Sequence, residues 1–141
     1  SDQIFANLER PLRQIHPHQK QDVDVIILGG GPSLAKYEDE IREKRKAGAK
    51  LITTNGTYNW VIERGMIPSA QIIVDAREFN NRFVNPIIPG CQYLLASQCH
   101  PSVFDAVPPE QTWLWYPLVP SSGGFNSNVD GSTVIAQARF P

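Results

Sequence analysis

The sequence predicts an α/β domain built around a mostly parallel sheet of about five strands. Five short apolar runs recur along the chain, and the first three are rich in Ile, Val and Leu without clean alternation. Segments with helical periodicity lie between these runs. Continuous apolar runs suit strands that are covered on both faces, and short links between strands and helices favour right-handed crossovers.

The predicted strands have similar lengths and spacing. They span Asp24–Leu28, Lys50–Thr54, Gln71–Val74, Gln92–Ala96 and Thr112–Tyr116. The first four runs are followed by polar or glycine-rich sequence, which a purely structural sheet would not require.

The first predicted helix follows Ser33, a good N-cap residue. Leu34, Tyr37 and Ile41 are spaced three or four apart and form one apolar stripe, as expected for a helix that covers a sheet. Gly48 is predicted to end this helix.

Three further helices are expected. One runs from about Thr57 to Arg64 and is predicted to end at Gly65 and Pro68, and a short one follows Pro101. The last begins at Asp130 or Ser132 and is still running at the end of the sequence. We therefore expect a Rossmann-like, three-layer arrangement that is truncated at its C-terminus.

Two regions are expected along the chain. Residues 1–20 form an N-terminal helical extension, with a short helix over 2–15 that Pro11 interrupts, and residues 21–141 form the α/β domain. The stretch 120–128, rich in Pro, Ser and Gly, is predicted to be a long loop.

Composition limits the possible partners. The 141 residues are 41% hydrophobic and 19% charged, with a net charge of −1 from thirteen basic and fourteen acidic side chains. This balance gives no electrostatic reason to expect duplex nucleic acid or an anionic membrane as a partner. No signal peptide or run of eighteen apolar residues occurs. Cys91 and Cys99 match no zinc or redox motif, so we expect reduced thiols and a cytoplasmic location.

The turn after the first strand is the main candidate site. It consists of Gly29, Gly30, Gly31, Pro32 and Ser33. Glycines allow close approach of the backbone to a ligand, and a following helix N-terminus favours phosphate. The turn is not the dinucleotide fingerprint, because Leu34 stands where the third glycine belongs, and it is not a Walker loop. A purely structural connection remains the alternative.

The other strand ends add polar candidates. Asn55 either makes an Asn-Gly turn or hydrogen-bonds a base or ribose. Asp75 either caps the next segment or binds Mg²⁺, with Glu78 as a possible helper, and Arg77 is a candidate phosphate contact or a surface ion-pair partner. His100 is either structural or an acid–base group.

Taken together, the motifs "ILGGGPSL", "ITTNGTYNWVIERGMIPSAQIIVDAR" and "DGSTVIAQA" resemble the 6-hydroxymethylpterin diphosphokinase-like family over about residues 23–138. The same module is the central domain of motility accessory factors implicated in flagellin glycosylation. A related Gly-x-Gly-Pro-Ser-Leu start occurs in bacterial sialyltransferases that use CMP-sugars.

The resemblance implies a Rossmann-like sheet that binds a nucleotide at the glycine turn, with Asn55 and Asp75 beside it. It also implies a second phosphate contact at a late helix N-terminus, formed by Gly131, Ser132 and Thr133. Members usually continue into a further strand ending near Gly-x-Asp, which this sequence does not reach.

Three functions follow as hypotheses. A diphosphokinase-like transferase would use Mg²⁺ near Asp75 and ATP, whereas a CMP-sugar glycosyltransferase would use a cytidine nucleotide, with His100 as the best candidate base. The third is a nucleotide-binding or interaction module without catalysis. NAD is disfavoured, because the fingerprint is incomplete and the second strand does not end in an acidic residue. The expected partners are a nucleotide and a small acceptor, and the oligomeric state stays open.

Overall fold

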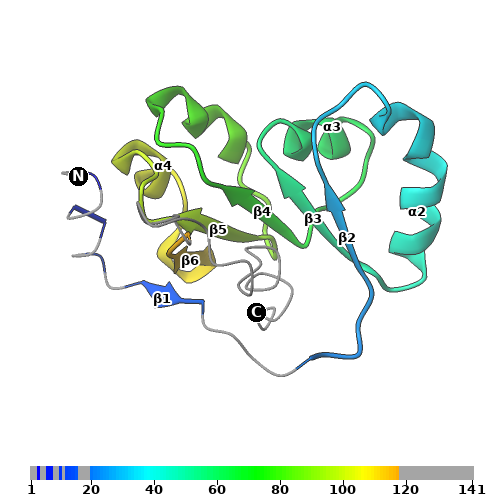
Figure 1. The fold of residues 1–141 in the computed structure, drawn as a ribbon, viewed down its shortest axis with the longest axis horizontal. Helices are drawn as coiled ribbons and strands as arrows, with labels where there is room; N and C mark the ends of the chain where they lie inside the picture. The colour runs from blue at the N-terminus through cyan, green and yellow to red at the C-terminus, as the bar shows by residue number, and fades with distance from the viewer. Residues whose placement is uncertain (1–2, 4–5, 8–9, 11, 16–19, 118–141) are drawn as a thin grey trace, which may run out of the picture.

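A computed structural model describes residues 3, 6–7, 10, 12–15 and 20–117. Its centre is a sheet of six strands in which every neighbouring pair is parallel, in the order β1-β6-β5-β4-β3-β2 (Figure 1). The strands are β1 (Arg13–Gln14), β2 (Val25–Leu28), β3 (Lys50–Thr54), β4 (Ala70–Ile73), β5 (Gln92–Ala96) and β6 (Thr112–Trp115). The predicted parallel α/β fold is confirmed.

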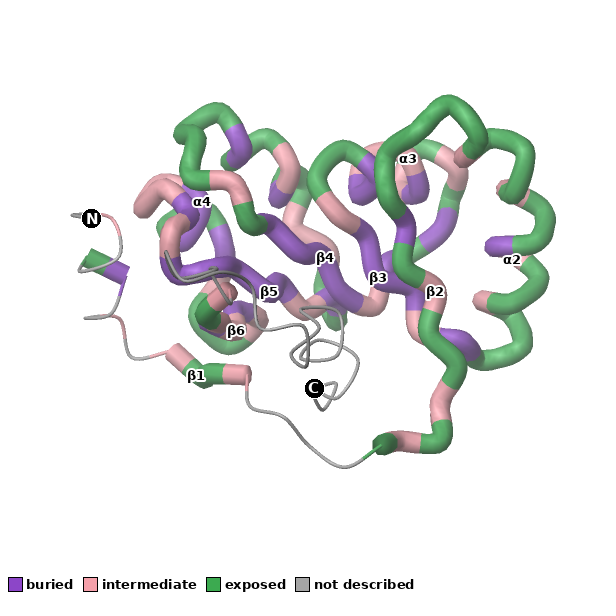
Figure 2. Tube along the Cα trace, in the orientation of Figure 1, coloured by how far each residue is buried: buried purple, intermediate pink, exposed green. Residues whose placement is uncertain are grey.

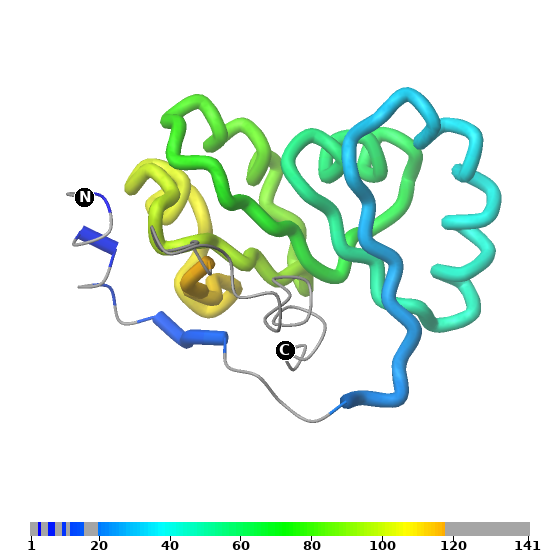
Figure 3. Tube along the Cα trace, in the orientation of Figure 1, coloured from blue at the N-terminus to red at the C-terminus, as the bar shows by residue number. Residues whose placement is uncertain are grey.

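Helical segments connect the strands. They are η1 (Leu34–Tyr37), α2 (Glu38–Lys46), α3 (Thr57–Glu63), η2 (Glu78–Val84), α4 (Pro101–Asp105) and η3 (Pro109–Gln111). From β2 to β6 the chain always moves to the next strand in the same direction, as the colour sequence of Figure 3 shows. Right-handed crossovers of this kind place their helices on one face of the sheet.

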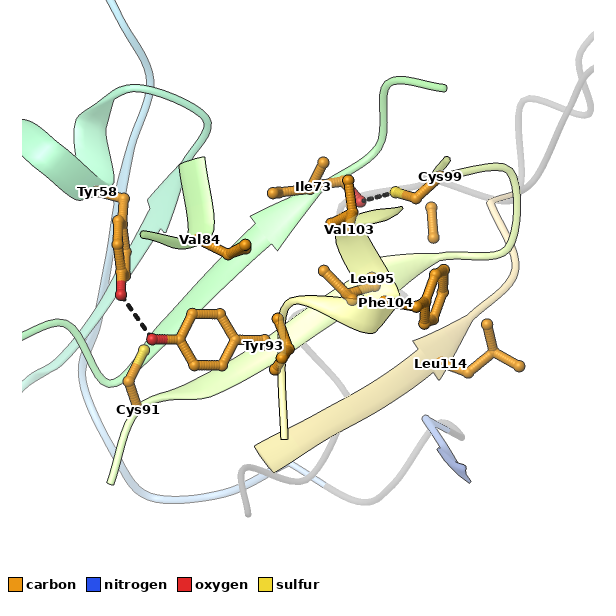
Figure 4. Packing of buried hydrophobic residues seen from close by; sticks show 12 residues of the cluster. Tyr58, Ile73, Val84, Cys91, Tyr93, Leu95, Cys99, Val103, Phe104 and Leu114 are labelled. Atoms are coloured by element: carbon orange, nitrogen blue, oxygen red, sulfur yellow. Dashed lines mark hydrogen bonds between the residues drawn. The ribbon is translucent and has the colours of Figure 1, made fainter. Parts of the chain in front are cut away.

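Two clusters of buried side chains lie between the sheet and these helices. In one, Ile41 of α2 and Val61 of α3 pack with Leu28 and Leu51. In the other, Val103 and Phe104 of α4 pack on strand side chains that include Tyr93 and Leu95 (Figure 4). Leu51, Val61, Tyr93, Leu95 and Val103 have no exposed surface, so this side of the sheet holds most of the core.

A third cluster lies on the opposite face and contains only strand side chains among its buried members: Ile52, Ala70, Ile72 and Leu94. On this face β2 is poorly covered, because Val25 is 39% and Ile27 is 53% exposed (Figure 2). Strand burial therefore falls off from the centre of the sheet toward β2.

The predicted helix over 2–15 differs from the structure at its C-terminal end, where Arg13–Gln14 forms β1. This short strand pairs with β6, and Ile15 donates a backbone hydrogen bond to Leu114 at 2.9 Å. The guanidinium of Arg13 also lies 4.2 Å from the Trp113 ring centroid. Pairing with the free edge of β6 thus overrides the local helical pattern, and the sheet gains a sixth strand.

The first helix also differs in detail. It begins as the 3₁₀ segment η1 and continues as α2, and the Ser33 side chain makes no capping hydrogen bond. The predicted stops are confirmed, because Gly48 has φ of 104° and Gly65 has φ of 77°, values that favour glycine. The predicted loop over 120–128 and the last helix lie outside the described residues.

Candidate functional site

The carboxyl ends of β2, β3, β4 and β5 meet at one edge of the sheet, because all four strands are parallel. In open α/β sheets, ligands bind beyond this edge. The glycine turn (Gly29–Ser33) follows β2, and Asn55 follows β3. Asp75 and His100 follow β4 and β5. The structure therefore brings the predicted site residues of the described ranges to one edge.

Neither the backbone conformation nor the packing of the glycine turn requires glycine. Gly29, Gly30 and Gly31 do not have φ in the left-handed region, and a Cβ added at any of them would meet no described atom within 4 Å. By contrast, Gly48, Gly65 and Gly90 have positive φ. Glycine at the turn is thus explained neither by backbone conformation nor by packing within the described residues.

The backbone of the turn is also free to donate. Among the described residues, no hydrogen bond is donated by the N–H groups of Gly29, Gly30, Gly31 or Ser33, and all four residues are exposed. Pro32 has no N–H, and the turn is closed by Leu34 N–H donating to the Gly31 carbonyl at 3.2 Å. Successive free N–H groups in a turn suit an anionic ligand.

A hollow of about 290 Å³ opens beside the turn. Gly29 and Ser33 form part of its wall, between the outer side of β2 and the η1–α2 segment. Its remaining lining is Ile26, Ile27, Leu28, Leu34, Tyr37, Glu40, Ile41 and Lys44. This volume is at the lower end of small-molecule sites, and a mostly apolar lining with a few polar side chains is typical of them.

Two threonines hold the turn at the end of β3. Thr54 Oγ1 donates to the Leu28 carbonyl at 2.7 Å, and Thr57 Oγ1 lies 3.3 Å from the same carbonyl. Thr57 Oγ1 also accepts from Thr54 N–H at 2.8 Å. The residue that precedes the glycine turn is therefore tied to the strand-to-helix turn beside it. Thr57 was not singled out from the sequence, because a threonine there is also an ordinary helix start.

Gln71 is a second positioning residue that sequence reasoning missed. It is fully buried, and its Nε2 donates to the carbonyls of Asn55 at 2.9 Å and Phe83 at 2.8 Å. Thr53 Oγ1 donates to its Oε1 at 2.7 Å. Gln71 therefore joins the turn after β3 to the segment after β4. A polar side chain at this position of the run "AQIIV" was the available signal.

Asn55 has φ of 47°, a left-handed conformation that Asn tolerates better than most residues. This explains the Asn-Gly pair as a turn. Its side-chain amide is exposed and makes no hydrogen bond within the described part of the chain. The turn conformation therefore leaves the amide available for a ligand.

Asp75 is engaged by its neighbour Arg77. Its carboxylate accepts from the Arg77 backbone N–H at 2.9 Å and from Arg77 Nε at 2.6 Å. The Arg77 guanidinium, followed by its backbone N–H, lowers the pKa of Asp75, so the carboxylate is charged at neutral pH. No group of three or more His, Cys, Asp or Glu side chains converges in the described ranges. Mg²⁺ that is bound with a nucleotide takes most of its ligands from the phosphates and from water. One protein carboxylate is therefore enough for such a site.

His100 caps α4. Its Nδ1 accepts from Ser102 N–H at 3.1 Å and lies 2.9 Å from Ser102 Oγ. Since a backbone N–H can only donate, Nδ1 is the unprotonated nitrogen and the neutral ring carries its proton on Nε2. A ligand would therefore meet an N–H donor at Nε2, which is not the form of a general base.

N-terminal side chains cover the edge beside His100. Asn7 is fully buried, and its Nδ2 donates to the carbonyls of Ser97 and Cys99, each at 2.8 Å. Gln3 Nε2 donates to the Gln98 carbonyl at 2.9 Å. Within the described ranges, these contacts cover the end of β5 and leave the ends of β2, β3 and β4 uncovered by N-terminal side chains. Gly131, Ser132 and Thr133 lie outside the described residues.

The fold and this edge define a parallel α/β domain of the kind that binds small molecules beyond its strand ends. Residues 2–140 match the family described as 6-hydroxymethylpterin diphosphokinase MptE-like. The chain belongs to this family, which confirms the resemblance inferred from its motifs. The family description names a diphosphokinase, which is a class of transferase.

A solved structure shares the fold. It is the MAf glycosyltransferase from Magnetospirillum magneticum AMB-1, with a TM-score of 0.58 and 15% sequence identity. The similarity covers 85% of this chain and 20% of that chain, so this chain spans about one fifth of its length. No similar sequence was found among curated proteins. Within the described ranges, no helix is long and apolar enough to cross a bilayer.

Proposed function

We propose that this domain binds a nucleotide at the glycine turn and serves a diphosphokinase-like transferase. One observation carries the proposal: Gly29, Gly30 and Gly31 have neither left-handed φ nor a close neighbour, and the turn that they form borders a hollow through Gly29 and Ser33. A phosphate group supplies the close contact that explains three consecutive glycines, and the free N–H groups supply its hydrogen bonds.

In this proposal the nucleotide brings Mg²⁺, and Asp75, which follows β4 at the same edge of the sheet, is the carboxylate assigned to it. Mg²⁺ would neutralise charge on the phosphates during transfer. The contribution of the chain is to hold the phosphates through the turn and to orient the base or ribose through the Asn55 amide. A small-molecule acceptor and a cytoplasmic location stay predictions.

The test is thermal unfolding with ATP, GTP, CMP and CTP, each with and without Mg²⁺. A nucleotide at a hundred times its Kd adds about 2.7 kcal/mol, which raises the Tm by several degrees. We expect a shift with ATP and Mg²⁺ that is lost in Gly30→Arg. Asp75→Asn should reduce the part of the shift that depends on Mg²⁺ and keep the part that does not.

Other outcomes identify the alternatives. The glycosyltransferase structure shares the fold, and a preference for cytidine nucleotides would favour a CMP-sugar transferase instead. No shift with any nucleotide, in a folded sample, would contradict nucleotide binding by this chain and favour an interaction module. An equal shift in Gly30→Arg would place the nucleotide elsewhere.

A further inference from the structure

The hollow beside β2 shares part of its wall with the glycine turn. Gly29 and Ser33 belong to both, and the volume of the hollow is about 290 Å³. Sites that hold a whole drug-sized ligand have about 300–1,000 Å³. The hollow therefore suits one ring system better than a whole nucleotide. A ring that is attached to phosphates at the turn would have this space next to it.

Most of the lining is apolar. Leu28 and Ile41 are 5% and 4% exposed, and they pack with the partly buried Ile26 and Leu34. Tyr37 is the aromatic residue of the lining and is 53% exposed. Apolar walls gain free energy by covering the faces of a flat ring, and an aromatic side chain stacks on such a ring.

One wall of the hollow is the free edge of β2, which pairs only with β3 in the described sheet. The Asp24 carbonyl accepts from Lys50 N–H at 2.8 Å, on the β3 side. The Leu28 carbonyl accepts from Thr54 Oγ1 at 2.7 Å on the same side. Because the direction of the backbone groups alternates along a strand, the N–H and carbonyl of Ile27 point away from β3. Ile27 lines the hollow, so a backbone donor and a backbone acceptor lie at its wall.

The helix side of the hollow carries a pair of opposite charges. Glu40 and Lys44 of α2 both line it, and Lys44 Nζ lies 4.0 Å from Glu40 Oε1. Both side chains are 59% exposed, and an ion pair of this kind contributes little free energy. Either group can therefore turn to a ligand. The carboxylate accepts from amino and ring N–H groups, whereas the ammonium donates to ring nitrogens and carbonyl oxygens.

We propose that the hollow binds the heteroaromatic base of the nucleotide whose phosphates lie at the glycine turn. The inference rests on the proposed function, which supplies those phosphates. A base has a π face for Tyr37, and its edge carries both donors and acceptors. That edge meets the Ile27 backbone and the charged pair of Glu40 and Lys44. Of the two groups considered for the Asn55 amide, this arrangement leaves the ribose.

The test is NMR of protein with ¹³C-labelled isoleucine methyl groups and ¹⁵N-labelled amides, titrated separately with adenosine, guanosine and cytidine. An aromatic base shifts the signals of methyl groups next to its ring. We expect the Ile26 and Ile41 methyl signals and the Ile27 amide to move and saturate with at least one nucleoside. The methyl signal of Ile73, which is fully buried in another cluster, should stay in place. The nucleoside that saturates at the lowest concentration identifies the base.

Four variants decide which side chains act. Tyr37→Ala should weaken nucleoside binding about fivefold or more by loss of stacking. Tyr116→Ala, at an exposed tyrosine outside the hollow, is its control and should bind fully. Glu40→Ala should weaken binding about fivefold, whereas Glu43→Ala makes the same charge change on α2 outside the hollow and should have no effect. Full binding by both Tyr37→Ala and Glu40→Ala would overturn the inference, and so would equal losses in the controls.

Titrations with ATP and with tripolyphosphate separate this inference from the proposed function. Movement of the Gly30 amide with both, while ATP leaves the Ile26 and Ile41 methyl signals in place, overturns only the base site. Saturating nucleoside shifts at these methyl groups, without any Gly30 response to ATP, support the base site and contradict phosphate binding at the turn.

Hydrogen exchange in the free protein tests a different occupant. If a polypeptide segment or a second copy of the chain covered the free edge of β2, the Ile27 amide would be protected from exchange. Protection of this amide together with no nucleoside response would overturn the inference. Fast exchange that slows when a nucleoside is added would support it.

Discussion

Individual glycines in this domain have two distinct uses. At Gly48, Gly65 and Gly90 the backbone has positive φ, which any other residue adopts only with strain. At Gly29, Gly30 and Gly31 the backbone imposes no such demand, and added Cβ atoms would meet no described neighbour. The first group serves the fold, and the second is available to a ligand.

This difference gives a stability prediction at the residue scale. Gly65→Ala should lower the free energy of unfolding by about 1 kcal/mol or more, because Ala is strained at φ of 77°. Gly30→Ala should leave it unchanged or raise it by up to about 1 kcal/mol, since the unfolded chain loses freedom. Urea denaturation measures both variants. A large loss of stability in Gly30→Ala would mean that glycine is structural there.

Among the elements, α4 depends on a side chain that sequence reasoning had placed among the candidate catalysts. His100 Nδ1 accepts the Ser102 N–H at the start of this short helix, and Pro101 follows at its first position. Capping of α4 by this hydrogen bond is a structural role that explains a histidine at position 100. A catalytic use of the same ring would have to act through Nε2.

Substitution at the cap separates these two uses. His100→Ala should cost about 1 kcal/mol of stability, because the N-terminal N–H of α4 loses its acceptor. His100→Asn should restore most of it, since Asn is a good N-cap. Chemical denaturation measures the stability of each variant, and nucleotide turnover provides the second readout. A stable Asn variant without turnover would favour a catalytic histidine, whereas full turnover would favour the cap alone.

At the scale of the whole molecule, the core contains weak acids in neutral form. Cys91 and Cys99 have no exposed surface, and burial raises the pKa of each thiol to about 12. Burial also raises the pKa of Tyr93 to about 12, and its hydroxyl lies 2.6 Å from that of Tyr58. These groups are free to ionise when the chain unfolds, at ordinary pKa values of about 8.5 and 10.

Stability should therefore fall in alkali. Since the folded pKa values are raised, the contribution of the thiols is complete below about pH 8.5 and is lost as the pH rises toward about 12. Urea midpoints between pH 7 and 10.5 should show this decline. In the double variant Cys91→Ala, Cys99→Ala, the urea midpoint should fall less between pH 7 and pH 10.5 than it does in the parent protein. A flat profile in the parent protein would contradict neutral buried thiols.

The sequence by itself determined the alternation of strands and helices, the parallel sheet and the family, because apolar periodicity, helix stops and motifs are local. Gly48 and Gly65 ended their helices as predicted, since their φ values depend on neighbouring residues. The tertiary structure decided the place of Arg13–Gln14, which joined β6 because a free sheet edge outweighs local preference.

Tertiary structure also decided the surroundings of each candidate site residue. The hydrogen bonds of Gln71 and the cover by Asn7 join parts of the chain that only folding brings together. Space is likewise a three-dimensional property: the sequence showed three glycines, and only the fold showed that nothing in the described chain fills the room beside them.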